Sequence, residues 1–161
     1  MKLDLERQGP GRTHLDVDER LPTGAPEPLP SAVGLRGRLT VDNLESRVLV
    51  TGVLAGEAVA MCDRCLEDFT CAFDTAVEIV VLRDPDSAEG ELDSWVIHQR
   101  SGEVDLDEPL REAALLGLPL KFVCADACRG LCPHCGANRN RESCACAQDD
   151  SDSRWGDLPG E

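Results

Sequence analysis

The chain has few of the large aromatic side chains that usually fill a protein interior. Its 161 residues include three Phe, two Trp and no Tyr. Leu, Val and Ala must therefore do most of the packing, in a chain long enough for one modest domain with appendages. Such a thin core commonly needs a cross-link for stability, and the nine cysteines are the residues that could supply one.

Long apolar segments are also missing. The residues after Met1 read KLDLERQGPGRTHLDVDER, which is charged and lacks the apolar stretch of a secretory signal. No window approaches the roughly 18 apolar residues of a membrane span. These absences predict a cytoplasmic protein that does not bind membranes. In that compartment thiols stay reduced, and closely spaced cysteines are typical of metal sites.

Positive charge is scarce as well. The chain has 16 Lys and Arg against 31 Asp and Glu, which gives a formal net charge of −15. An acidic surface repels phosphate groups and anionic headgroups. This balance disfavours non-specific binding to nucleic acid and favours a basic protein as a partner.

Catalytic motifs are absent too: there is no GxSxG, no phosphate-binding Gly-rich loop and no HExxH. Cys128 to Cys135 matches the C-x3-C-x2-C spacing of radical enzymes that use S-adenosylmethionine. Those enzymes need a large α/β barrel after the motif, and only 26 residues follow Cys135. We therefore predict no enzyme, no catalytic residue and no small-molecule substrate. An iron–sulfur cluster without that chemistry stays open, because thiolates bind both iron and zinc.

Composition divides the chain into four parts. Residues 1–31 are charged and rich in Pro and Gly, which predicts a flexible or extended arm. Residues 32–123 should form a β-rich domain with one helix, residues 124–148 a cysteine-rich zinc module, and residues 149–161 an acidic tail. The predicted fold is mainly β (α+β): a small antiparallel β domain with one helix and a C-terminal cysteine-rich zinc module.

Alternating apolar and polar side chains predict the strands. The clearest is 70–82, and others are expected at 35–41, 46–54 and 94–98, with an acidic loop at 83–93. Asp107 is expected to cap a helix that has Pro109 in its first turn and stops at Pro119. A short strand near Leu3 is a further expectation.

Eight of the nine cysteines fall into four close pairs. Structural zinc takes four ligands in a tetrahedron, and two sulfurs a few residues apart occupy two of its corners. Gly136, directly after Cys135, permits the tight turn that points backbone amides at the sulfurs. The first predicted zinc site consists of Cys132, Cys135, Cys144 and Cys146.

The two remaining pairs each lack a neighbouring pair. A lone C-x2-C such as Cys62 and Cys65 is also the pattern of a redox dithiol. We predict instead that both pairs share a second zinc ion, because closing so long a loop would stabilise a thin core. This second site consists of Cys62, Cys65, Cys124 and Cys128. Cys71 is expected in the core. A four-sulfur set leaves His134 unneeded, and His14 and His98 have no companions that suggest chemistry.

Basic and amide side chains gather in the cysteine-rich module. They suit contacts with RNA or a partner, and two further arginines on a strand face could extend the patch. The candidates are Arg129, Arg139, Arg141, Asn138, Asn140, Arg36 and Arg38. An equal alternative is that the arginines hydrogen-bond the zinc-bound sulfurs and cap the acidic tail. Without aromatic stacking surface, direct RNA affinity should be weak.

Two motifs carry a resemblance to a known family. One reads L-C-x2-C-G-x-N-x-N from Leu131 to Asn140 and continues to C-x-C at Cys144. The other is C-x-R-C-L at Cys62. Together they resemble the bacterial YceD-type family of large-ribosomal-RNA-subunit accumulation proteins, over about residues 30 to 158. Ser153 stands where proline is usual in that family, and Arg139 replaces a common leucine.

The resemblance implies an accessory factor in the synthesis, processing or stability of large-subunit (23S) ribosomal RNA. It implies as partners the pre-50S ribosomal particle, ribosomal RNA, or a basic ribosomal or assembly protein. Two alternatives stay open. One is an acidic adaptor that docks a basic protein without touching RNA, and the other is a thiol- or zinc-responsive sensor.

Overall fold

The structure is a computed structural model that describes residues 1–83, 95–99 and 101–146. Most of the predicted acidic loop at 83–93 and the predicted tail at 149–161, with Ser153, lie outside the described residues.

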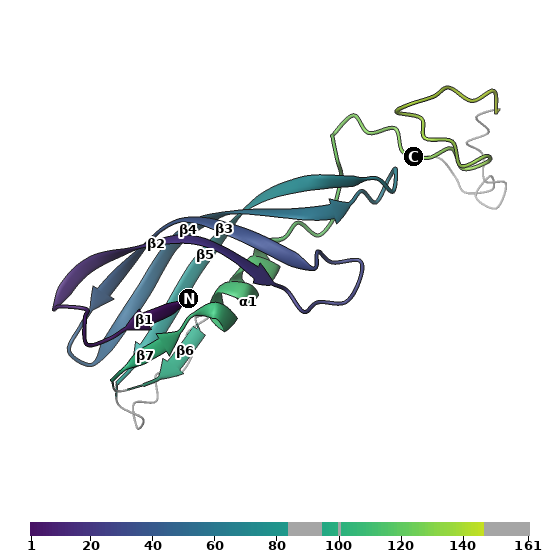
Figure 1. The fold of residues 1–161 in the computed structure, drawn as a ribbon. Coiled ribbons are helices and arrows are strands. Elements are labelled where there is room, and N and C mark those ends of the chain that lie inside the picture. The colour runs from purple at the N-terminus through teal and green to yellow at the C-terminus, as the bar shows by residue number, and fades with distance from the viewer. Residues whose placement is uncertain (84–94, 100, 147–161) are drawn as a thin grey trace, which may run out of the picture.

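A five-stranded sheet forms the body of the molecule (Figure 1). Its order is β2-β3-β4-β5-β6. The first four strands follow one another as antiparallel neighbours: β2 (Gly11–Pro22), β3 (Ala32–Asn43), β4 (Arg47–Met61) and β5 (Asp68–Leu82). The short β6 (Trp95–His98) pairs with the end of β5.

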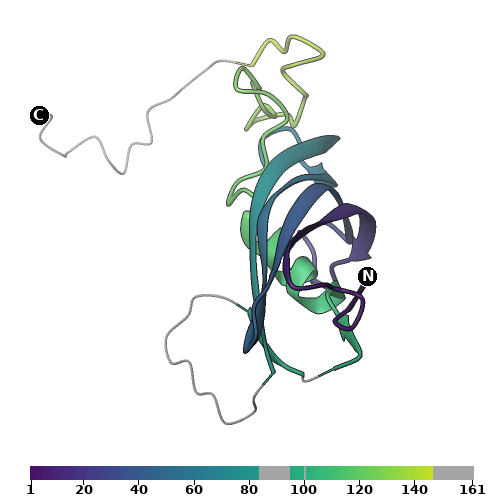
Figure 2. The ribbon, with the colours of Figure 1, turned by 90° about the vertical axis from the view of Figure 1, so that its left-hand side faces the viewer.

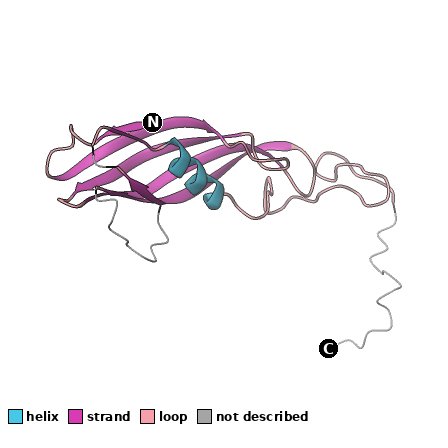
Figure 3. Cartoon of the chain, turned by 90° about the horizontal axis from the view of Figure 1, so that it is seen from below, coloured by secondary structure: helices cyan, strands magenta, loops and turns pink. Residues whose placement is uncertain are grey.

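The remaining elements pack on one face of this sheet. A second, two-stranded sheet joins β1 (Lys2–Asp4) to β7 (Glu103–Asp105), and α1 (Asp107–Gly117) follows β7. Figure 2 views the sheet along its edge, and Figure 3 shows α1 lying across one face of it. The core between them is filled by Leu, Ile and Val, which are the largest fully buried side chains. Aliphatic side chains thus dominate the core, as predicted, although Phe122 is also buried in it.

The strand pattern of the sequence is largely found in the structure. Leu35, Leu39 and Val41 face the core from β3, and Cys71 faces it from β5, as the alternation predicted. The run 46–54 and the residues leading to the first cysteine pair form the single strand β4. At the helix C-terminus, Gly117 lies close to β5, where an added Cβ would meet the Thr75 side chain at 2.7 Å.

Residues 1–31 are not a separate arm. They supply β1 and the edge strand β2, and Leu3, Leu5, Val17 and Leu21 are buried in the core. Charged residues such as Asp16 and Asp18 occupy the outward positions of β2, so the segment has a polar composition although its inward positions are apolar. The alternation, rather than the composition, carries the signal here.

Two further expectations need correction. The sheet is mixed rather than antiparallel, because β6 runs parallel to β5. The N-cap of α1 is Leu106, without a side-chain cap. Asp107 is the first helical residue, and its carboxylate pairs with the N-terminal amine of Met1. Within the described residues no helix is long and apolar enough to cross a membrane.

Candidate metal centre

The cysteine-rich segment lies beyond one end of the sheet, next to the turn between β4 and β5 (Figure 1). That turn carries Cys62 and Cys65 and is fastened to the segment after α1 by two hydrogen bonds. The Asp63 N–H donates to the Phe122 carbonyl, and the Phe122 N–H donates to the Asp63 carboxylate, each at 2.8 Å. The chain therefore returns to the hairpin tip just before Cys124.

Both C-x2-C pairs adopt the same turn. In the hairpin, the Leu66 N–H donates to the Cys62 carbonyl, and the Cys62 N–H to the Glu67 carbonyl. Residues 132–137 repeat this pattern: the Gly136 N–H donates to the Cys132 carbonyl, and the Cys132 N–H to the Ala137 carbonyl. The residue after the second cysteine has a left-handed φ in both, 57° at Leu66 and 73° at Gly136. The second turn uses the glycine that favours this conformation.

The structure brings together the same two sets of four cysteines that the sequence suggested. Within each set the four Sγ atoms lie within 4.8 Å of one another. We call the local set tetrad one and the long-range set tetrad two. Tetrad one is Cys132, Cys135, Cys144 and Cys146, and tetrad two is Cys62, Cys65, Cys124 and Cys128.

Tetrad two is the more buried set. Cys62, Cys65 and Cys128 form a small buried cluster against Phe69 and Val123. Its sulfurs approach closely across the chain: Cys62 Sγ lies 3.9 Å from Cys128 Sγ, and Cys65 Sγ 3.8 Å from Cys124 Sγ. In tetrad one only Cys132 is buried. Cys71 lies outside both sets in the main core, where it was predicted.

Backbone amides favour ionised sulfur in the turns. Burial raises the pKa of Cys62, but three N–H groups, the first that of Cys124, outweigh it and lower this pKa to about 6. The N–H groups of Cys135 and His134 lower the pKa of Cys132 to about 6.

Other thiols in each set are held neutral by their neighbours. The adjacent Cys128 sulfur raises the pKa of Cys124 to about 12, and the Cys135 sulfur raises the pKa of Cys146 to about 12. Four sulfurs this close repel one another when ionised, and a bound divalent cation removes that penalty. The donor set and its amides thus fit a metal ion.

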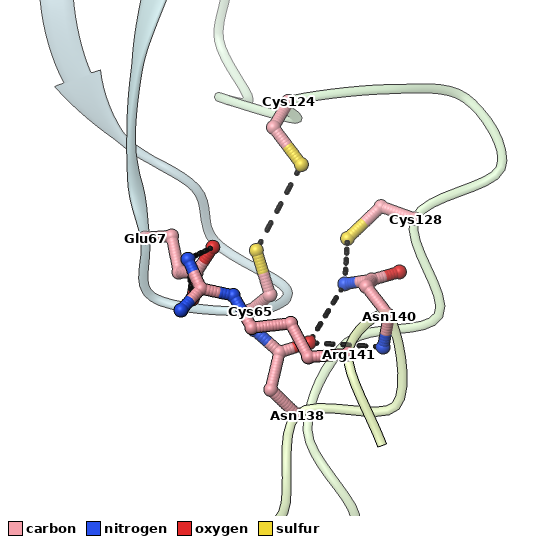
Figure 4. Close-up of polar contacts among 7 residues, drawn as sticks. All are labelled: Cys65, Glu67, Cys124, Cys128, Asn138, Asn140 and Arg141. Atoms are coloured by element: carbon pink, nitrogen blue, oxygen red, sulfur yellow. Dashed lines mark hydrogen bonds and ion pairs between the residues drawn. The ribbon is translucent and has the colours of Figure 1, made fainter. Parts of the chain in front are cut away.

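An asparagine of the module supports tetrad two (Figure 4). The Asn140 amide donates from Nδ2 to Cys128 Sγ at 3.3 Å, and its Oδ1 accepts the Arg129 N–H at 2.8 Å. Asn138 Oδ1 in turn accepts the N–H and Nδ2 of Asn140, both at 3.0 Å. The sequence predicted that both asparagines contact RNA or a partner; in the structure Asn140 bonds the Cys128 sulfur and Asn138 holds Asn140 in place.

The candidate arginines divide into two groups. Arg36 and Arg38 lie on β3 and pair with Asp18 and Asp16 of β2, at 3.0 and 2.6 Å. Arg141 pairs with Glu67 of the hairpin turn at 2.8 Å (Figure 4).

The other two arginines face a hollow of the cysteine-rich segment. Arg129 and Arg139 line a cavity of about 340 Å³ together with Arg141 and with Cys144 and Cys146 of tetrad one. This part of the predicted patch lies beside a candidate metal centre.

Arg64 and Gly130, to which the sequence analysis assigned no role, lie in contact at the junction between the two tetrads. Arg64 donates from its guanidinium to the carbonyls of Asp126 and Cys128, each at 3.1 Å, and its own carbonyl accepts the Leu131 N–H at 3.0 Å. Gly130 packs against this carbonyl with φ 68°, and an added Cβ there would lie 2.8 Å from it. The arginine of the family's C-x-R-C-L pattern is the signal that could have pointed to Arg64.

Fold and site together define a class: a mainly β protein whose sheet ends in a module of two four-cysteine clusters. Residues 50–160 match the family described as large ribosomal RNA subunit accumulation protein YceD. Since this match covers more than half of the chain, the chain belongs to the YceD family. The resemblance seen in the sequence is confirmed.

Individual relatives agree with this assignment. The "Large ribosomal RNA subunit accumulation protein YCED homolog 1, chloroplastic" of Arabidopsis thaliana is 23% identical over 188 residues, which cover 96% of this chain and 59% of that protein. Uncharacterized proteins of Mycobacterium bovis and Mycobacterium tuberculosis are 34% identical over 122 residues, covering 74% of this chain and 58% of each relative. The chain thus spans less than two thirds of the length of these relatives. No solved structure matches it.

Proposed function

We propose that each tetrad binds one zinc ion, and that the protein is a zinc-stabilised, non-enzymatic accessory factor in the accumulation of large-subunit ribosomal RNA. One observation carries the metal assignment. A Zn–S bond of about 2.3 Å places tetrahedral sulfurs about 3.8 Å apart, and in tetrad two Cys65 Sγ lies 3.8 Å from Cys124 Sγ and Cys62 Sγ 3.9 Å from Cys128 Sγ. Membership of the YceD family supports the ribosomal role.

The geometry favours a structural ion over a reactive one. Four cysteines close the coordination sphere of zinc and leave no position for a substrate. Sulfurs within 4.8 Å of one another enclose a single ion and leave no room for an iron–sulfur cluster with its own sulfides. The zinc ion of tetrad two would hold the cysteine-rich segment against the hairpin, and that of tetrad one would close the local loop, in the reducing cytoplasm where thiols persist.

Metal content is the direct test of the zinc assignment. Elemental analysis and native mass spectrometry of the purified chain should give two zinc ions per chain. The eight tetrad cysteines should resist alkylation until a chelator is added. One zinc ion per chain, with Cys62 and Cys65 freely alkylated, would remove tetrad two, and iron in place of zinc would reject the metal assignment.

The hollow beside tetrad one is our candidate contact with RNA or a ribosomal partner. Arg129 and Arg139 line it, and no ion pair of either side chain is found within the described residues. Arg36, Arg38 and Arg141 already have carboxylate partners. We therefore assign the contact to Arg129 and Arg139 first.

The double variant Arg129→Glu with Arg139→Glu should reduce co-sedimentation with pre-50S particles, while zinc content stays at two per chain. Arg36→Glu with Arg38→Glu is the control for net charge, since it makes the same charge change on β3; because it also breaks the pairs with Asp18 and Asp16, circular dichroism must first show that the sheet stays folded. Undiminished association of the first variant would favour the adaptor alternative, in which the acidic chain docks a basic protein. Absence of the wild type from pre-ribosomal fractions would favour the sensor alternative.

A further inference from the structure

Most of one side of β5 has no strand partner among the described residues. β4 pairs with β5 from Asp68 to Leu82, but on the other side β6 pairs only with Ile79–Leu82. Along residues 69–78 the backbone groups that do not point at β4 therefore face outward. An unpaired edge of this length is a template for another extended chain.

The helix borders this edge with a single apolar stripe. Pro109, Ala113, Leu116 and Gly117 of α1 lie opposite residues 74–79 of β5. Their spacing places them on one side of the helix. Together with Trp95 of β6 they line a groove of about 320 Å³. Leu116 is 80% exposed, so the groove presents a large apolar side chain that the fold itself does not bury.

The charge of the groove selects its occupant. Asp74 and Glu78 are among the lining residues, and no Lys or Arg of the described part of the chain lines it. A groove between a strand edge and a helix accepts an extended segment, which gains backbone hydrogen bonds from the edge and places alternate side chains in the groove. Carboxylates along it favour Lys or Arg in the positions between.

We propose that this groove binds an extended segment of a basic protein as an added strand on β5. One apolar side chain of the segment packs between Leu116, Ala113 and Trp95, and flanking Lys or Arg side chains pair with Asp74 and Glu78. A second copy of this chain fits less well. If two β5 edges met, they would bring the acidic residues of both copies together, and like charges on neighbouring strands repel. The inference goes beyond the proposed function and does not depend on the metal sites.

A random nonapeptide phage library, panned on the full zinc-loaded chain, tests the groove. Leu116→Glu provides the counter-selection, and Leu120→Glu is the matched control, because Leu120 is also an exposed leucine but lies outside the groove. Enriched peptides should alternate apolar residues with Lys or Arg. In fluorescence anisotropy, a synthetic enriched peptide should bind the wild type and Leu120→Glu with equal Kd. Its Kd for Leu116→Glu should be at least tenfold higher, which corresponds to a loss of about 1.4 kcal/mol of binding free energy.

Two further measurements report the binding mode. Methylation of alternate amides of the peptide should abolish binding, and the bound peptide should slow hydrogen exchange at residues 69–78. Enrichment on Leu116→Glu equal to that on wild type, selection of acidic peptides, or indifference to methylation would overturn the proposal. A wild-type dimer that Leu116→Glu converts to a monomer would assign the groove to a second copy and also overturn it. Zinc content and circular dichroism of each variant separate these results from failure of the metal assignment.

Discussion

Cys62 and Cys128 lie 66 positions apart in the chain, whereas all four cysteines of tetrad one fall between residues 132 and 146. The C-x2-C turns of the two tetrads share one hydrogen-bond pattern, yet the two tetrads bring different segments of the chain together. Tetrad two ties the β4–β5 hairpin to the segment after the helix, and tetrad one closes a local loop. The same type of turn thus serves a long-range connection within the domain at tetrad two and a local loop at tetrad one.

The difference has a thermodynamic consequence. In the chain-entropy account, a cross-link stabilises by about 3 kcal/mol for a 15-residue loop and about 4.7 kcal/mol for a 100-residue loop. A metal clip follows the same dependence on loop length. A metal ion at tetrad two should therefore stabilise the whole domain against unfolding, because the hairpin that it holds is formed by β4 and β5 of the sheet. A metal ion at tetrad one should stabilise only its own loop.

The largest expected difference between the tetrads is seen when one cysteine is removed from each in two separate variants. Cys65→Ser should lower the Tm of the sheet by about 10 °C, given the loop closed and the entropy of unfolding of a chain this size. It should also expose Cys124 and Cys128 to alkylation. Cys132→Ser should release zinc from tetrad one and leave the Tm of the sheet within about 3 °C of wild type. Differential scanning calorimetry with cysteine-resolved alkylation measures both.

Cys71→Ala is the control for these two variants, because Cys71 is buried but belongs to neither tetrad. It should leave two zinc ions bound. Unchanged protection of Cys124 and Cys128 in Cys65→Ser would show that the two pairs do not share an ion.

Two glycines with similar φ allow a second comparison, with an expected effect of intermediate size on the free energy of unfolding. Gly130 lies at the junction of the tetrads, and an added Cβ would lie 2.8 Å from the Arg64 carbonyl, whereas a Cβ at Gly136 meets nothing within 4 Å. Gly136→Ala should cost only the left-handed conformation, about 1 kcal/mol. Gly130→Ala adds a backbone clash and should cost about 2 kcal/mol or more. Urea unfolding of the zinc-loaded chain compares them, and equal costs would show that the junction yields to the added methyl group.

The most local expected effect concerns the amide beside tetrad two. Asn140→Ala removes the hydrogen bond to Cys128 Sγ, and loss of such a supporting contact typically weakens metal binding by about tenfold or more. Competition with a chromophoric chelator should show this loss at tetrad two and none at tetrad one. Arg139→Ala, on the same loop, is the control and should retain both affinities. Equal weakening of both tetrads by Asn140→Ala would mean that the asparagine shapes the loop rather than supporting one sulfur.

Local sequence patterns predicted the structural elements that depend mainly on residues close together in the chain. The alternation at 70–82 and the apolar positions around Leu35 identified β5 and β3, because strand side chains point alternately to the two faces. The helix was found to within one residue of its cap. The short strand expected near Leu3 is β1, but β2 was missed because its charged outward positions dominated the composition, while the inward Val17 and Leu21 were too sparse to stand out.

By itself, the sequence determined the family, the mainly β class and the four close cysteine pairs, since each rests on residue types at short spacings; that Cys62 and Cys65 meet Cys124 and Cys128 is a long-range contact of the tertiary structure. Only the tertiary structure decided that residues 1–31 belong to the sheet and that β6 runs parallel to β5. It also decided that Asn140, held by Asn138, contacts Cys128, and that residues 69–78 of β5 have no second strand partner among the described residues. These features depend on which distant segments meet, and contacts between distant segments leave no periodic signal along the chain.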